Sequence, residues 1–283
     1  MLRKIMKGED RTEAQIRQHY EVEVELADKL RNSTPDQRKK EKLYTSVYDE
    51  MFSKVTDHPL LLRKVSKEKI AKSIAWQLQL LNRFIHKNST FVEIGAGGCG
   101  LSFKLCEVVK KVYAVDVSNI LSDSQSIPDN FELIISDGVR VELDTESVDV
   151  VYSNQLMEHI HPDDATVQLA DIFRILKPGG AYICITPNKV NGPWDISYYY
   201  DEFATAFHLK EYTNEELVAL FKSIGFKTSK LYVGARGFYM RFPICITIWL
   251  EKLLMRFSVN LRAKIGRSLL FRSLLGVKLV AIK

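Results

Sequence analysis

The residues with the clearest chemical potential form a glycine-rich segment, Glu93 to Gly100, which reads EIGAGGCG. The segment begins in a short β-rich run, residues 90–94, and leads into a helical pattern over residues 101–109. Glycine lets the backbone turn sharply and lets a ligand approach without a Cβ in the way. The pattern therefore predicts a strand, a tight loop and a helix that hold a small ligand beside Gly95 and Gly97.

Acidic residues at nearby strand ends narrow the choice of ligand. Glu93 precedes Gly95, Asp116 follows the second predicted strand, and Asp137 with Gly138 closes the third. A carboxylate beside the loop suits a cationic ligand better than an anionic pyrophosphate, and Asp137 could accept a hydrogen bond from an adenine amino group. These features favour S-adenosylmethionine, which carries an amino group and a sulfonium, as the cofactor.

A second interpretation takes the loop pattern literally. Gly95, Gly97 and Gly100 fit G-x-G-x-x-G, and Asp116 lies about 20 residues further on, as in a dinucleotide site. That interpretation predicts an oxidoreductase that uses NAD(P). A non-catalytic binding protein of the same fold is a third alternative, but the acidic residues at the strand ends speak against it.

The elements that must position these residues alternate between short β-rich runs and helical patterns. The β-rich runs are residues 90–94, 111–115, 131–136, 148–153 and 181–186. Such alternation predicts parallel strands joined by crossover helices. A helix over residues 163–176 should end at an LKPGG turn, residues 176–180. The sequence therefore predicts an α/β fold with a doubly wound, mostly parallel sheet.

Residues 1–88 are predicted to form an N-terminal helical cap, and residues 89–283 the cofactor-binding domain. Residues 12–30 are polar with spaced apolar side chains, and a capping box at Thr34 starts a second helix. A third helix should follow, because aliphatic residues recur at spacings of three and four. These residues are Ile70, Ile74, Leu78, Leu81 and Ile85.

The order of the motifs resembles that of class I S-adenosylmethionine-dependent methyltransferases, which have a Rossmann-like fold. The resemblance is carried by residues 93–100, 114–116, 137–138, 153–159 and 176–180 within residues 90–226. The chain also resembles the branch that methylates quinone precursors, sugars and other small metabolites. Where the family's loop usually has a third glycine, this chain has Cys99.

The resemblance implies a role for each matching residue. The glycine loop would pass beside the methionine part of the cofactor, Asp116 would receive both ribose hydroxyls, and Asp137 would face the adenine. Ser153 and Asn154, at the carboxyl end of the fourth strand, would present backbone oxygen to the cofactor amine. The acceptor would be a small molecule, methylated on an oxygen of a sugar or secondary metabolite. The last strand, residues 277–282, would run antiparallel.

Methyl transfer needs the acceptor, the methyl group and the sulfur held in line, and a general base only where the nucleophile keeps its proton. His159 and His208 are the candidate bases, although each could equally cap or pack against a helix. The connection over residues 188–212 is long and rich in aromatic residues, and long ordered loops are usually functional. We expect it to form a wall of the acceptor site, with a self-packed lid as the alternative.

The C-terminal part of the chain is strongly basic. From Ala235 onward the chain has ten Lys or Arg residues and one acid, Glu251, whereas the whole chain carries a net charge of only +5. The remainder is therefore acidic, which argues against a nucleic-acid-binding core. Within residues 236–275 the apolar spacing predicts two amphipathic helices. We expect a lid over the domain; a peripheral contact with an anionic membrane through residues 243–272 is the alternative.

Other features exclude several classes of protein. No apolar run follows the basic N-terminus, so no secretory signal peptide is expected. The longest apolar stretch, residues 243–250, is too short to span a membrane. The four cysteines are scattered without a Cys-x-x-Cys pair, so neither a metal site nor a disulfide framework is predicted. The expected location is the cytoplasm.

Overall fold

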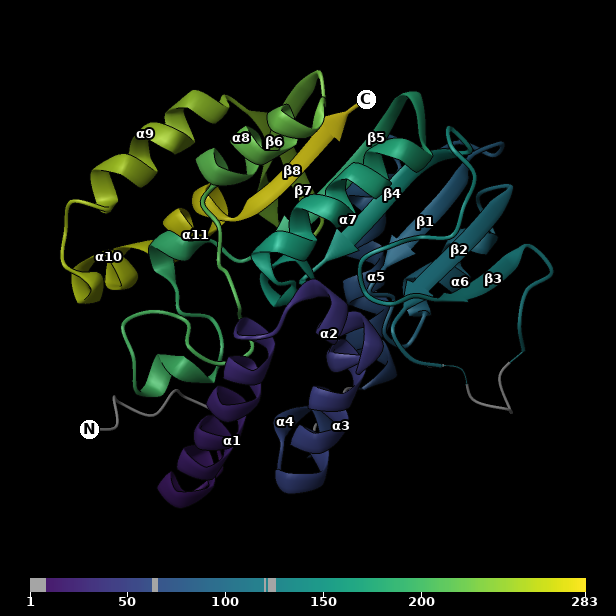
Figure 1. The fold of residues 1–283 in the computed structure, drawn as a ribbon. Helices are drawn as coiled ribbons and strands as arrows, with labels where there is room; N and C mark the ends of the chain where they lie inside the picture. The colour runs from purple at the N-terminus through teal and green to yellow at the C-terminus, as the bar shows by residue number, and fades with distance from the viewer. Residues whose placement is uncertain (1–8, 63–65, 120, 122–125) are drawn as a thin grey trace.

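An eight-stranded sheet with the order β3-β2-β1-β4-β5-β8-β6-β7 forms the centre of the fold (Figure 1). The computed structural model describes residues 9–62, 66–119, 121 and 126–283. The strands are β1 Thr90–Ile94, β2 Lys111–Asp116, β3 Phe131–Ile135, β4 Val148–Asn154, β5 Leu176–Thr186, β6 Thr228–Ala235, β7 Phe238–Phe242 and β8 Val277–Ile282. β1 to β5 are parallel, and β8 runs antiparallel between β5 and β6. The predicted Rossmann-like sheet with an antiparallel last strand is confirmed.

Two strands differ from the prediction. β5 already begins at Leu176, where the sequence predicted a turn, because Leu176 pairs with Val148 before a register shift in the ladder. Gly179 adopts a φ of +81° in this irregular stretch, a conformation that favours glycine. β7 was not predicted; it follows a turn at Arg236 and pairs antiparallel with β6.

Helices cover both faces of the sheet (Figure 1). They are α1 Glu13–Arg31, α2 Pro35–Lys40, α3 Leu43–Lys54, α4 Pro59–Leu62, α5 Lys67–Leu81, α6 Gly100–Cys106, α7 Pro162–Ile175, α8 Asn214–Ile224, α9 Ile244–Leu254, α10 Val259–Gly266 and α11 Leu269–Leu275. α7 and α8 pack in one apolar core, and α5 and α6 pack in the other. Strand β4 is buried on both faces. Its successive side chains point to opposite sides of the sheet, so Val151 packs in the first core and Val150 in the second.

The N-terminal helices are arranged in two groups. α1 and α2 begin at the capping boxes of Thr12 and Thr34. With α3 they lie beyond one end of the parallel strands, as Figure 1 shows. α5 instead packs against α6 in the second core, so it belongs to a face of the sheet. The helix ends at Leu81, and Ile85, predicted to continue its apolar face, lies after it.

The C-terminal insertion contains more elements than the two predicted helices. After β7, the described residues form α9, α10 and α11. Ser258 and Ser268 occupy the N-cap positions of α10 and α11, which divides the predicted second helix in two. None of the described helices has the length and apolarity that a membrane span requires.

Candidate functional site

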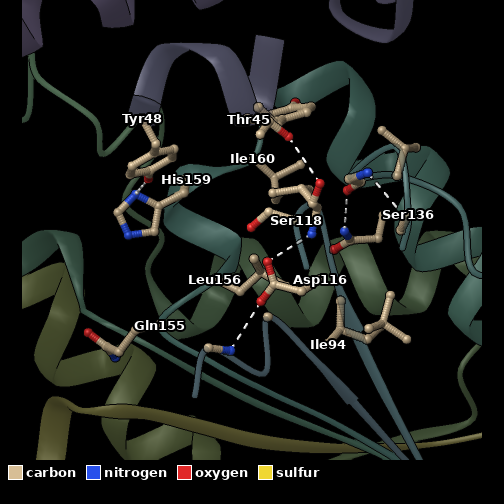
Figure 2. A pocket seen from close by; sticks show the side chains of 18 of the residues that line it. Thr45, Tyr48, Ile94, Asp116, Ser118, Ser136, Gln155, Leu156, His159 and Ile160 are labelled. Atoms are coloured by element: carbon tan, nitrogen blue, oxygen red, sulfur yellow. Dashed lines mark hydrogen bonds between the residues drawn. The ribbon is translucent and has the colours of Figure 1, made fainter. Parts of the chain in front are cut away.

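A cavity of about 490 Å³ lies at the carboxyl ends of β1, β2 and β4 (Figure 2). Its floor contains Ile94 and Asp116 from the strand ends, and its opposite wall contains Tyr44 and Tyr48 from α3. Ligands of open α/β sheets bind in this position, outside the carboxyl ends of the strands. The cavity is therefore the candidate functional site.

The glycine loop forms one wall of this cavity. Gly95 and Gly97 line it with φ angles of +73° and +48°, in the left-handed region that side chains disfavour. A Cβ on Gly95 would lie 3.2 Å from Leu156, whereas a Cβ on Gly97 would meet no protein atom within 4 Å. Gly97 thus leaves room that a side chain would take away.

Asp116 (Figure 2) is one of two carboxylates among the described residues that line the cavity, the other being Asp49 of α3. Its Oδ2 accepts a hydrogen bond from the Gly97 amide at 3.1 Å, and its Oδ1 accepts one from the Val117 amide at 2.8 Å. These bonds fix the carboxylate against the loop. A carboxylate has about four lone-pair positions, so both oxygens can accept further hydrogen bonds from a ligand.

Glu93 lies beneath the loop and does not line the cavity among the described residues. Its Oε2 accepts a hydrogen bond of 2.5 Å from the Ser102 hydroxyl on α6. Burial raises the pKa of Glu93 to about 7. A positive charge placed in the cavity would favour the ionised form, which is the contribution that the sequence predicted for this acid.

Asp137 and Gly138, which follow β3, face different hollows of the surface. Gly138 lines the cavity, with Tyr44 packed where its Cβ would be. Asp137 instead lines a second hollow, accepts hydrogen bonds from the Val139 and Arg140 amides, and lies 3.3 Å from Lys39. The structure therefore does not bring the Asp137 side chain to the cavity where the resemblance implied an adenine contact.

The residues at the end of β4 differ in whether they line the cavity. Ser153 is fully buried and its hydroxyl is 2.8 Å from that of Tyr182, and neither it nor Asn154 lines the cavity. The next residues, Gln155 and Leu156, do line it. Gln155 has a φ of +56°, so the chain turns directly after the strand.

The two candidate histidines have different surroundings. His159 lines the cavity beside Tyr48 (Figure 2). Its Nδ1 lies 3.1 Å from both the Tyr48 hydroxyl and the carbonyl oxygen of Phe207. Because a carbonyl only accepts, this Nδ1 carries the proton and Nε2 keeps the lone pair. Burial and the charge of His208 lower the pKa of His159 to about 3, so the ring is neutral at physiological pH.

His208 lies behind His159, with ring centroids 4.9 Å apart, and does not line the cavity. Its Nδ1 bonds to Glu211 Oε1 at 2.8 Å. Burial opposes the charged ring, but the Glu211 hydrogen bond and the nearby carboxylates outweigh burial and raise the pKa of His208. His208 is thus a buried residue that lies outside this cavity.

Two clusters of described residues bring imidazole and carboxylate atoms within 4.8 Å of one another. They are His19 with Glu23 and His58, and Glu158 with His159 and His208. In the first, His19 Nε2 is 2.5 Å from Glu23, and Arg11 contacts the other ring nitrogen. In the second, Glu158 accepts from Thr186 and its other oxygen has no hydrogen-bond partner.

The sequence interpretation missed the contribution of α3. Tyr44, Tyr48 and Phe52 all line the cavity, and they recur at every fourth residue, on one face of the helix. That spacing is visible in the sequence. It could have placed an aromatic wall in the cap, although not the partner that this wall faces.

The connection over residues 188–212 does not line the cavity among the described residues. Ile196 and Tyr199 pack against Ile16 of α1 in a small core of their own. Arg267, which directly follows α10, stacks on Tyr198, 4.1 Å from the ring centroid, and its guanidinium donates to the carbonyl of Pro193. This packing fits the self-packed alternative for part of the connection, while its role as an acceptor wall stays a prediction.

Comparisons with known proteins match the part of the chain that contains the glycine loop and Asp116. Residues 92–184 match the family model of a methyltransferase domain. A Mycolicibacterium smegmatis protein described as a probable S-adenosylmethionine-dependent methyltransferase is 33% identical over 88 residues. This match covers 31% of the chain and 32% of that protein, so the chain spans about a third of the length of the curated relative.

Solved structures share the fold. A chain of the Haloferax volcanii complex that contains the Trm112 methyltransferase activator has a TM-score of 0.53 and 17% identity, over 76% of this chain and 92% of that one. A SAM-dependent methyltransferase from Archaeoglobus fulgidus has a TM-score of 0.50 and 17% identity, over 85% of this chain and 100% of that one. At these identities the likeness establishes the fold.

Proposed function

We propose that the whole chain, whose residues 92–184 match the model of a methyltransferase domain, transfers a methyl group from S-adenosylmethionine to a small acceptor molecule. The observation that carries the proposal is the cavity at the strand ends, where the glycine loop and the Asp116 carboxylate face the same space. The cavity's charge and position suit a cationic nucleoside cofactor.

The cofactor would lie along the strand ends. Asp116 would accept hydrogen bonds from the two ribose hydroxyls, because its oxygens face the cavity beside Gly97. Gly95 and Gly97 would pass beside the methionine part, which agrees with the open space at the Gly97 Cβ position. The adenine would rest near Gly138 and the apolar side chains of Val117 and Val139.

The transfer forms one bond and breaks another at the methyl carbon. The bound cofactor would supply an activated methyl group: as a lone pair of the acceptor forms its bond to the methyl carbon, the carbon–sulfur bond would break with its electrons on sulfur and leave S-adenosylhomocysteine. The chain's main task is to hold the reacting atoms in line and to exclude water. We propose an oxygen acceptor, of a sugar or a secondary metabolite, whose O–H proton goes to a nearby base or to solvent.

His159 is the histidine that we propose as the base. Replacing it with alanine is expected to lower turnover about 100-fold, within the usual range for a lost general base, while the affinity for S-adenosylhomocysteine stays within about twofold. Because the pKa of His159 is lowered to about 3, the unprotonated ring is present throughout pH 5 to 8, and turnover should show no histidine inflection there.

The matched comparison is His208→Ala, since His208 lies behind His159 and outside the cavity. It should reduce turnover far less. Full activity of the His159 variant would show that this residue is not the base. The rate of methyl transfer would then depend on how the chain positions the acceptor and the methyl group.

The acceptor can be found directly. Cell extract incubated with the protein and isotopically labelled methyl donor should contain a small metabolite that gains the labelled methyl group, identified by mass spectrometry. Heat-inactivated protein is the control. Label that appears only in macromolecules, or in no molecule, would contradict the proposed small-molecule acceptor.

A further inference from the structure

A second cavity, of about 460 Å³, opens beside the first along the same edge of the sheet. It lies at the carboxyl ends of β5 and β6, at Thr186 and Ala235, and at the start of β8, Val277. Gln155, which follows β4, lines both cavities. A molecule in the second cavity would therefore be a neighbour of a molecule in the first.

The charges that line this second cavity are of one sign. Arg236, Arg272 and Lys278 line it, and no aspartate or glutamate is among its described lining residues. Within the part of the chain that the structure describes, none of the three forms an ion pair or a side-chain hydrogen bond. Cations gathered without an acid repel one another and favour an anion in the space between them.

Lys278 shows most clearly the effect of a cavity whose described lining contains no acidic residue. Burial and the neighbouring Arg272 lower the pKa of Lys278 to about 8. Its Nζ lies 2.7 Å from the place where a Cβ on Gly276 would be, so the absence of a side chain at Gly276 makes room for the ammonium. Lys278 is half-buried; a partly desolvated cation without a partner is costly, and a bound anion would reduce that cost.

We propose that the second cavity binds a phosphoryl group carried by the methyl acceptor. A phosphoryl group suits this lining better than a carboxylate, because two guanidinium groups and one ammonium can balance two negative charges, and guanidinium matches phosphate geometry. Trp194 and Tyr239 would pack against the rest of the molecule. The inference rests on the proposed function and names its substrate class, a phosphorylated small molecule.

Calorimetric titration of the full chain, saturated with S-adenosylhomocysteine, tests this inference with inorganic phosphate and inorganic sulfate as probes. Both anions should bind saturably, and the double variant Lys278→Met/Arg272→Gln should bind them at least tenfold more weakly. Sulfate keeps its charge across pH 7 to 9, so its affinity should fall about tenfold over this range as Lys278 loses its proton. The Lys278→Met variant should lose that pH dependence.

The matched control is Lys227→Met, an exposed lysine beside β6 that does not line the cavity. It should bind both anions like the unaltered chain. Failure of the chain to bind S-adenosylhomocysteine would count against the proposed function itself. Normal cofactor binding without saturable anion binding, or anion binding unchanged in the double variant, would overturn only the phosphoryl site.

A different observation concerns the outer face of α9. Thr247, Glu251 and Leu254 form its buried face. The opposite face exposes three large apolar side chains, Ile246 at 44%, Trp249 at 62% and Leu253 at 36%. We define the outer face as these three residues together with two further exposed residues, Phe257, which follows α9, and Leu261 of α10.

The charge around this outer face is positive. Arg256 and Lys264 are exposed and have no acidic partner among the described residues. Glu251, the one acid in the sequence of residues 236–275, points inward and accepts hydrogen bonds from Asn188 and Asn214. An apolar face with a tryptophan, flanked by these two basic residues, matches an anionic lipid surface.

We infer that the outer face docks on an anionic phospholipid bilayer. The structure also shows why two of the basic residues are not part of this contact. Arg262 is buried and contacts the Met255 sulfur, and Arg267 binds carbonyl groups of the 188–212 connection. The inner face thus covers that connection, as expected of a lid, while the outer face stays free.

Flotation with vesicles that contain about 30% phosphatidylserine tests the docking. The chain should float with these vesicles, and not with pure phosphatidylcholine vesicles, because the lipid charge supplies part of the attraction. Trp249→Glu/Leu253→Glu and Arg256→Glu/Lys264→Glu should each abolish flotation. The matched control is Val167→Glu, an exposed apolar residue on α7 that should leave flotation intact. No flotation, or a dimer in solution that both double variants disrupt, would overturn the membrane contact.

Discussion

Replacing Asp116 with alanine is expected to weaken S-adenosylmethionine binding by about 2 to 4 kcal/mol, or roughly 30- to 1,000-fold. The carboxylate faces the cavity and is already held by the Gly97 and Val117 amides. Its replacement removes the proposed acceptor of two ribose hydrogen bonds and one negative charge beside a cationic ligand. Titration calorimetry of the purified variant measures the loss.

Asp137→Ala is the matched control for this experiment. Asp137 follows the neighbouring strand β3, but its side chain lies in another hollow beside Lys39. The dissociation constant should therefore change by less than about twofold. An unchanged affinity of the Asp116 variant would contradict the cofactor placement, and an equal loss in both variants would support the adenine contact that the sequence resemblance implied for Asp137.

Replacing Asp164 with alanine is expected to lower the free energy of unfolding by about 3 to 5 kcal/mol, the usual cost of breaking a buried ion pair from one side. Arg38 of α2, only 1% exposed, donates two hydrogen bonds to Asp164 of α7, at 2.6 and 2.9 Å. The Tyr44 hydroxyl donates a third at 2.6 Å. Alanine would leave the Arg38 guanidinium buried without its acid.

The adjacent Asp163 provides the control, because its side chain is 69% exposed. Asp163→Ala should change stability by less than about 0.5 kcal/mol. Urea denaturation of both variants gives the comparison. Because Tyr44 lines the cavity, the Asp164 variant should also bind S-adenosylmethionine more weakly at temperatures where it remains folded. Equal stability of the two aspartate variants would contradict the role of this buried network.

The central strands could be predicted from the sequence because each is a short β-rich run between turn or helix signals. The predicted bounds of β1, residues 90–94, and β8, residues 277–282, agree with the structure. β5 was less predictable at its start, since proline and glycine favour a turn locally while the neighbouring β4 supplies a pairing partner. Pairing with β4, and not the local turn preference, therefore determines where β5 begins.

The sequence could predict which residues of the candidate site meet only where they lie at the ends of adjacent strands. Asp116, Gly95 and Gly97 meet in one cavity because parallel strands end at the same edge. Side-chain direction was not predictable: Glu93 turns beneath the loop to Ser102, and Asp137 folds back on its own turn. The wall from α3 required a contact distant in sequence.

The C-terminal insertion shows another limit of periodicity. Apolar residues at spacings of three and four indicate helices, but they do not distinguish a face that packs on the protein from one that faces outward. In α9 both kinds of face are present, with Leu254 buried and Trp249 exposed. The burial of Glu251 and Arg262 depends on partners in residues 188–214, so spacing alone could not assign them.

The proposal that the first cavity holds S-adenosylmethionine is tested most directly by calorimetric titration of the purified chain with S-adenosylhomocysteine and, separately, with NADH. The account predicts saturable binding of S-adenosylhomocysteine, with one molecule per chain, and no heat of binding with NADH. Binding of NADH without binding of S-adenosylhomocysteine would contradict it and would support the dinucleotide interpretation of the glycine loop.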